Sequence, residues 1–126
     1  MQKSNSKKTL RKPQQQQRPG YEFKMQPKPV FENKGIPSVG KLNNKVALIT
    51  GGDSGIGRAV AVLFAKEGAD ISIVYLNEKS DAIETKRIIE VEHGRRCMLI
   101  ATDISKERNC KSAVQKTVKG FLKIDV

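Results

Sequence analysis

The chain has 126 residues, which suits one small domain and argues against two. Only 37% of its residues are hydrophobic and 5% are aromatic, so part of the chain is expected to lie outside any core. The formal net charge of +11 raises the question of an acidic partner such as nucleic acid or a membrane surface.

The first 40 residues differ in composition from the rest. They hold nine basic and two acidic residues, all five prolines and the run Gln14–Gln17, without helical or alternating periodicity. Residues 41–126 hold fifteen basic and eleven acidic residues. A charged, proline-rich stretch buries too little apolar surface to offset the entropy of ordering it. We therefore predict a flexible, largely irregular basic extension over 1–40 and a folded unit over 41–126.

No pattern typical of secretion or of a membrane span is present. Met1–Gly20 is basic but has no apolar run of seven residues, which argues against a secretory signal and leaves a mitochondrial presequence as the alternative. The longest apolar run, Ala59–Ala65, is far shorter than the roughly 18 residues that a span needs. Cys97 and Cys110 fit no metal or redox spacing. We expect a cytoplasmic protein with reduced thiols and no metal site.

From Lys41 onward, short apolar runs alternate with helical stretches, which is typical of βαβ units and a parallel sheet. Strands are predicted at 46–50, 71–76 and 97–101, and a fourth would begin near 124. Helices are predicted from the N-cap Ser54 to Gly68, over 81–92, and from near Ser105. The positions predicted to face the core are, in the first helix, Ile56, Ala59, Val60, Leu63 and Phe64, and in the last, Cys110, Ala113, Val114, Thr117, Val118 and Phe121.

The strongest chemical signal is the turn between the first strand and the first helix, which reads Thr50-Gly51-Gly52-Asp53-Ser54-Gly55-Ile56-Gly57. A dinucleotide pyrophosphate needs a tight turn, close approach to the backbone and the unpaired amides at the positive end of a helix. Gly51, Gly55 and Gly57 meet these needs at the right places. The competing interpretation is an ordinary glycine-rich turn, which the position directly between strand and helix disfavours.

This turn resembles the phosphate loop of the short-chain dehydrogenase/reductase family, Thr-Gly-three residues-Gly-any-Gly. The resemblance covers 41–126 and implies an NAD(P)-dependent oxidoreductase that moves hydride between nicotinamide and an alcohol or carbonyl. The segments Pro19–Pro29 and Tyr75–Glu78 look like an N-terminally extended, glucose/ribitol-dehydrogenase-like bacterial subgroup, so a sugar or polyol substrate is expected. Cofactor contacts are implied for the loop residues Gly51, Asp53, Ser54, Gly55, Ile56 and Gly57.

The resemblance also implies the N-terminal half of a Rossmann-like doubly wound α/β fold with strand order 3-2-1, homo-oligomeric in intact relatives. Asp103 and Ile104 match the place where the family sets an Asp and the next backbone against the adenine; Asp103 could also cap the following helix. The family's catalytic Ser, Tyr and Lys would lie beyond Val126. We therefore assign no catalytic residue and expect this chain alone to be non-catalytic.

The choice between NAD and NADP stays open at this point. An acid at the end of the second strand would accept the ribose hydroxyls, whereas a basic residue would tolerate a 2′-phosphate. Tyr75 holds that position and Glu78 follows in the loop. Lys79 and Ser54 could instead meet a phosphate.

Two other functions are kept as alternatives. One is a non-catalytic nucleotide-binding or interaction module that retains the loop without the chemistry. The other, which we consider less favoured, is nucleic-acid binding by the basic tail, because Tyr21, Phe23 and Phe31 interleave with lysines. The resemblance instead implies an arm that packs over a neighbouring subunit through Tyr21, Phe23 and Met25, and we favour that role over a solubilising tail.

Overall fold

The computed structural model describes residues 13–18 and 20–126, so the prediction for a targeting segment falls largely outside the described residues. Three parallel strands form the sheet: β1 (Val46–Thr50), β2 (Asp70–Tyr75) and β3 (Cys97–Ala101). They lie in the order β1-β2-β3. The predicted α/β fold with strand order 3-2-1 is confirmed.

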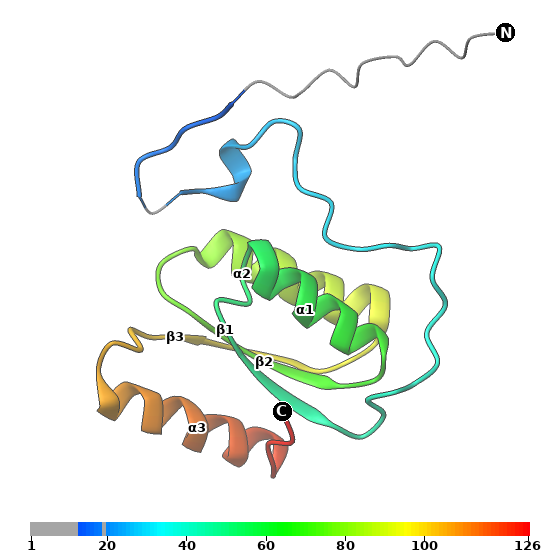
Figure 1. Cartoon of the computed structure of the whole chain (residues 1–126). Coiled ribbons are helices and arrows are strands. Elements are labelled where there is room, and N and C mark those ends of the chain that lie inside the picture. The colour runs from blue at the N-terminus through cyan, green and yellow to red at the C-terminus, as the bar shows by residue number, and fades with distance from the viewer. Residues whose placement is uncertain (1–12, 19) are drawn as a thin grey trace, which may run out of the picture.

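Helices cover both faces of the sheet (Figure 1). One face carries α1 (Gly55–Lys66) and α2 (Lys79–Arg87), which continues into the π-helical turn η2 (Ile88–Glu92). The other face carries α3 (Glu107–Phe121). Consecutive parallel strands are thus joined through helices that pack on the sheet.

The core has one layer on each face of the sheet, because side chains alternate along β2. Ile71 and Ile73 pack with the alanines of α1 and with Ile89 on the face covered by α1 and α2. Val74 packs on the opposite face with residues of β3 and α3. On that second face the buried hydroxyls of Ser72 and Thr117 lie 2.8 Å apart, within hydrogen-bond distance.

The predicted inner face of α1 was largely wrong. Ile56 and Leu63 are 86% and 52% exposed, and only Phe64 of the predicted five packs against the core cluster. The buried residues are instead Arg58, Ala61, Val62 and Ala65. Small alanines let the helix lie close to the sheet, and α1 is apolar around most of its circumference, so periodicity could not select the correct face.

The predicted inner face of α3 was right in part. Ala113, Thr117 and Phe121 are buried, whereas Val114 and Val118 are 44% and 41% exposed. The buried residues form one i, i+4 row along the helix, and a residue one position further is rotated by about 100° away from it. The two valines therefore lie beside the contact row and not on it.

Residues near Val126 run alongside β1, on the edge opposite β2. The amide of Val126 donates to Val46 O (3.1 Å), and the amide of Leu48 donates to Val126 O (2.9 Å). Both bonds together are the pattern of a parallel pair. The chain here is placed as the first residue of a fourth strand would be.

The described residues before Lys41 form an arm that lies against its own chain. Its one regular element among the described residues is the short 3-10 helix η1 (Glu22–Lys24). Near α1, Asn33 O accepts from Lys66 Nζ (3.0 Å), and Glu67 Oε2 accepts from the amides of Val39 (3.2 Å) and Lys41 (2.9 Å). Whether the arm also covers a neighbouring subunit stays a prediction. Within the part of the chain that the structure describes, no helix is long and apolar enough to cross a membrane.

Candidate functional site

The sequence-predicted site residues lie at the edge where the three parallel strands end. There the amide of Gly51 donates to Val74 O (2.7 Å), and the amide of Thr102 donates to Tyr75 O (2.9 Å). These two bonds extend the ladder past the strands and hold the glycine turn, the end of β2 and the loop after β3 side by side. Ligands of open parallel sheets bind at this edge.

The glycine turn presents bare backbone to open space. Gly51 and Gly55 have φ of +67° and +54°, in the left-handed region that favours glycine, and a Cβ at either would meet nothing within 4 Å. Gly57 serves the fold differently, because its Cβ would lie 1.9 Å from Gly51 O. Gly57 therefore allows the start of α1 to pack against the turn, while Gly51 and Gly55 leave the approach from outside open.

The first turn of α1 follows directly. Ser54 stands at the N-cap position with extended backbone, and the first helical bond runs from the Arg58 amide to Ser54 O (3.1 Å). The predicted cap is correct in position but not in side chain, because Ser54 makes no capping hydrogen bond. The amides of Gly55, Ile56 and Gly57 thus precede the helical ladder, at the positive end of the helix dipole.

The residues predicted on the neighbouring strands reach the same edge in different environments. Tyr75, the last residue of β2, is only 9% exposed. Asp103 Oδ1 accepts from the Ser105 amide (2.9 Å), and hydrogen bonding from Ser105 lowers the pKa of Asp103. Asp103 thus shapes the loop before α3, and the alternative that it caps this helix is wrong, because the N-cap residue is Lys106. Ile104 is 46% exposed. The adenine contacts assigned to Asp103 and Ile104 stay predictions.

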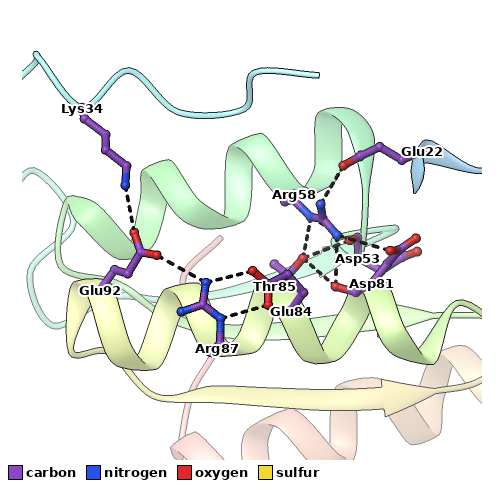
Figure 2. Close-up of polar contacts among 9 residues, drawn as sticks. All are labelled: Glu22, Lys34, Asp53, Arg58, Asp81, Glu84, Thr85, Arg87 and Glu92. Atoms are coloured by element: carbon purple, nitrogen blue, oxygen red, sulfur yellow. Dashed lines mark hydrogen bonds and ion pairs between the residues drawn. The ribbon is translucent and has the colours of Figure 1, made fainter. Parts of the chain in front are cut away.

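A buried polar network under the turn was missed by the sequence reasoning (Figure 2). Its centre is Arg58, which is 6% exposed. Arg58 Nε donates to Asp53 O (3.0 Å) and to Thr85 Oγ1 (2.8 Å), and Nη2 donates to Asp81 O (3.2 Å). The guanidinium therefore ties the glycine turn to α2. A single charged residue within the apolar run of α1 was the signal that could have drawn attention to it.

Asp53 itself is 6% exposed. Burial raises the pKa of its carboxyl above the ordinary value, and the carboxylates of Glu78 and Asp81 act in the same direction, whereas the charge of Arg58 opposes them. This carboxyl holds a proton more readily than an exposed one would.

The arm contributes a second acid to the turn. Glu22 Oε1 accepts from Arg58 Nη1 (2.6 Å), and Glu22 Oε2 accepts from the amide of Gly55 (2.5 Å). The Glu22 and Arg58 side chains are 13% and 8% exposed, so this ion pair is largely shielded from water. Glu22 lies 33 residues before Gly55, and nothing in the sequence indicated that the two would be in contact.

The structure also shows the surroundings of the two cysteines and bears on the prediction of no metal site. Cys97 is buried, and burial raises the pKa of its thiol to about 12, which makes it unreactive at neutral pH. Cys110 is also a free thiol. Among residues 13–18 and 20–126, no three His, Cys, Asp or Glu side chains are grouped so that they could hold a metal ion.

Comparison with known protein families adds to this geometry. The family model described as short chain dehydrogenase matches residues 45–126. Among curated proteins, an uncharacterized oxidoreductase of Bacillus subtilis, YhdF, is 57% identical over 115 residues, and General stress protein 39 of the same bacterium is 52% identical over 123. Glucose and ribitol dehydrogenase homolog 2 of Arabidopsis thaliana is 42% identical over 120 residues.

These alignments cover 90%, 98% and 90% of this chain but only 39%, 43% and 42% of the three relatives. The chain thus spans about two fifths of the length of the curated relatives it matches.

Solved structures agree. A short chain dehydrogenase from Burkholderia cenocepacia in complex with NADP is similar with a TM-score of 0.64 and 36% identity, over 67% of this chain and 34% of that one. L-sorbose reductase from Gluconobacter frateurii, complexed with NADPH and L-sorbose, is similar with a TM-score of 0.62 and 34% identity, over 67% of this chain and 32% of that one.

Proposed function

This chain belongs to the short-chain dehydrogenase family, and from that premise we propose that its glycine turn binds the pyrophosphate of a nicotinamide dinucleotide. The observation that carries the proposal is the bare backbone of Gly51 and Gly55 beside the first amides of α1. Phosphate oxygens need close approach and amides that make no helical bonds, and this turn offers both at the strand ends. The residues present therefore fit the cofactor.

The proposed contacts follow from the positions of the residues. The amides of Gly55, Ile56 and Gly57 would donate to the pyrophosphate. Gly51 and Ser54 would face the adenosine ribose, with Tyr75 beside it, and Asp103 and Ile104 would meet the adenine. Asp53 supports this surface through its backbone oxygen, which accepts from Arg58 (3.0 Å) and Thr85 (2.9 Å).

For the whole protein we propose NAD(P)-dependent oxidoreductase activity on an alcohol or carbonyl, with a sugar or polyol as the substrate class. The bound nicotinamide would accept or supply the hydride, and this chain's residues would hold and orient the cofactor. The names of the plant relative and of the sorbose reductase support the substrate class. That the present chain alone is non-catalytic, and that the protein forms a homo-oligomer, stay predictions.

The cofactor can be NAD or NADP, and two similar structures hold NADP or NADPH. Near the proposed ribose position, Lys79 is exposed and Glu78 is half-buried. The two side chains favour opposite cofactors, since a 2′-phosphate is attracted by an ammonium and repelled by a carboxylate. Both dinucleotides therefore enter the test.

The test is calorimetric titration of the full chain with ADP-ribose, NAD and NADP, repeated with Gly55→Ala. A methyl group at position 55 meets no protein atom within 4 Å and would stand where the phosphates approach. We expect affinity to fall at least about tenfold, because even a small displacement of a phosphate from its amide donors loses most of the bond.

Gly94→Ala is the matched control. Gly94 has a similar φ of +63°, and a Cβ there also meets nothing within 4 Å, but it lies before β3, at the other end of the sheet. The backbone strain is thus comparable, and binding should match the unchanged chain. Equal dinucleotide binding by the Gly55 and Gly94 variants would refute the site.

A further inference from the structure

The arm is fixed to both ends of α1 by its two acids. Glu22 binds the Gly55 amide at the start of the helix (2.5 Å), and Glu32 Oε1 lies 3.7 Å from Lys66 Nζ at its end. These are the only acidic residues among the first 40. The arm therefore follows the helix that begins at the phosphate loop, and one acid is placed directly on that loop.

The Glu22 carboxylate is held in place from several sides. Arg58 Nη1 donates to it at 2.6 Å, while the carboxylate of Asp81 lies farther from the guanidinium, at 3.8 Å. The ring of Phe31, also from the arm, has its centre 5.6 Å from Arg58 Cζ. Charge-assisted bonds of this kind are stronger than neutral ones. The Glu22 carboxylate is thus held in one position by specific contacts, unlike an acid on the solvent-exposed surface.

The position of that anion is the one the dinucleotide needs. A carboxylate oxygen on the first amide of α1 makes the same kind of contact as a phosphate oxygen. A cavity of about 400 Å³ adjoins it, lined by arm residues and the loop, among them Tyr21, Glu22, Met25, Ser54 and Gly55. The arm and a dinucleotide phosphate would therefore meet at the same backbone donor.

We propose that Glu22 gates the phosphate loop: its carboxylate occupies the anion position at Gly55, and a dinucleotide must displace it to bind there. This inference rests on the proposed function. It makes the N-terminal arm an intrinsic competitor of the cofactor, in addition to any role in assembly. Release of Glu22 would also free Arg58 Nη1 to face the incoming phosphate charge.

The first test compares ADP-ribose affinity of the unchanged full chain, Glu22→Gln and Glu32→Gln. Glutamine keeps the size of the side chain but removes the charge, so Glu22→Gln should bind about tenfold more tightly. Glu32→Gln is the matched control, since it also neutralises a shielded arm acid that contacts α1, and it should stay within about twofold of the unchanged chain.

The outcomes separate the gate from the proposed function. If the unchanged chain binds ADP-ribose and Glu22→Gln binds equally or more weakly, the gate is wrong while the proposed function stands. If neither binds, the proposed function is wrong and the gate falls with it. A tenfold gain in both glutamine variants would also overturn the gate, because the effect would then be a general one of arm charge.

A second measurement uses the unchanged chain, so it remains decisive if Glu22→Gln folds poorly. Trypsin can cleave after Lys24, two residues beyond Glu22, and after Lys34, farther along the arm. Displacement of the arm from Gly55 should make cleavage at Lys24 several-fold faster when ADP-ribose is added, with a smaller change at Lys34. Slower cleavage at Lys24 with ADP-ribose would mean that the ligand stabilises the arm contact, and would overturn the gate.

Discussion

The surroundings at the two ends of the sheet shift the pKa of a buried aspartate in opposite directions. At the carboxyl end, burial raises the pKa of Asp53, with other carboxylates nearby. At the amino end, burial also acts to raise the pKa of Asp70, but hydrogen bonds from Arg96 and the charges of Arg95 and Arg96 outweigh it and lower the pKa. Arg96 Nη2 and Arg95 Nη2 approach the two Asp70 oxygens at 2.7 and 2.8 Å.

The difference separates stability from binding within one small fold. The amino end joins β2 to the start of β3 by ion pairs whose shared acid is 7% exposed at the side chain. The carboxyl end keeps open backbone and places a buried acid where it adds little stability. Sites that bind ligands commonly give up stability in this way. Substitutions of the two aspartates should therefore differ in size and in sign.

The largest effect is expected at the carboxyl end, from Gly57→Ala. The new Cβ would lie 1.9 Å from Gly51 O and 2.6 Å from Gly51 C, and backbone atoms cannot move aside as a flexible side chain can. We expect a loss of about 3 kcal/mol or more in the free energy of unfolding. Urea denaturation measures it, with Gly55→Ala as the uncrowded comparison. A Gly57 variant within about 1 kcal/mol of the unchanged chain would contradict the close packing.

At the amino end, Asp70→Asn should cost about 2 kcal/mol at pH 7, because Asn cannot replace the charged acceptor of two arginines. The folded pKa of Asp70 lies below its unfolded value, so its stabilisation is present above the unfolded pKa and is lost as the pH falls through the folded pKa. The gap between variant and unchanged chain should thus be smaller at pH 3 than at pH 7.

Glu107→Gln is the control for Asp70, since Glu107 also pairs with a cation but is 79% exposed at the side chain. It should change stability by less than about 0.5 kcal/mol at either pH. An equal loss of stability for Asp70→Asn at both values of pH would contradict this explanation, because the loss would then not come from the charge of Asp70.

The smallest effect, and of opposite sign, is expected from Asp53→Asn. Its folded pKa is raised, so stability falls as the pH rises from the unfolded pKa through the folded one, and removing the charge should stabilise the fold at pH 7. We expect a gain of under about 1 kcal/mol, visible as a higher Tm at pH 7 and absent at pH 3. A lower Tm at pH 7 would mean that the carboxylate has a stabilising partner.

Much of this fold could be predicted because local signals agreed with one another. β-branched runs marked the strands and glycines marked the turns. When α2 and η2 are taken together as one helical segment, the elements begin and end within about two residues of the predicted positions. The inner face of α1 could not be predicted, because Ala61 and Ala65 are selected by the closeness of helix and sheet. A hydrophobic pattern shows which residues are apolar, but it does not show how closely a helix will pack against the sheet.

The candidate site was predictable only where backbone chemistry defines it. Gly51 and Gly55 were identified because positive φ and open approach require glycine. Glu22 and Arg58 were missed because their roles depend on the path of the arm over α1 and on burial under the turn. Neither property follows from residue type or spacing along the chain.

The hydroxyl pair between β2 and α3 has a further consequence. Thr117 donates to Ala113 O (2.9 Å), which leaves Ser72 to donate to Thr117 across 2.8 Å. If α3 slid along the sheet by one turn, Thr117 would keep its bond to Ala113 O within the helix, but the Ser72 hydroxyl would be buried without a partner, at a cost that an all-apolar contact would not impose. The pair thus favours the observed placement of α3 over one shifted along the sheet. Because the loop that contains Asp103 leads into α3, the placement of α3 also determines how far this loop extends past the end of the sheet. A contact in the core thereby positions residues at the carboxyl edge of the sheet.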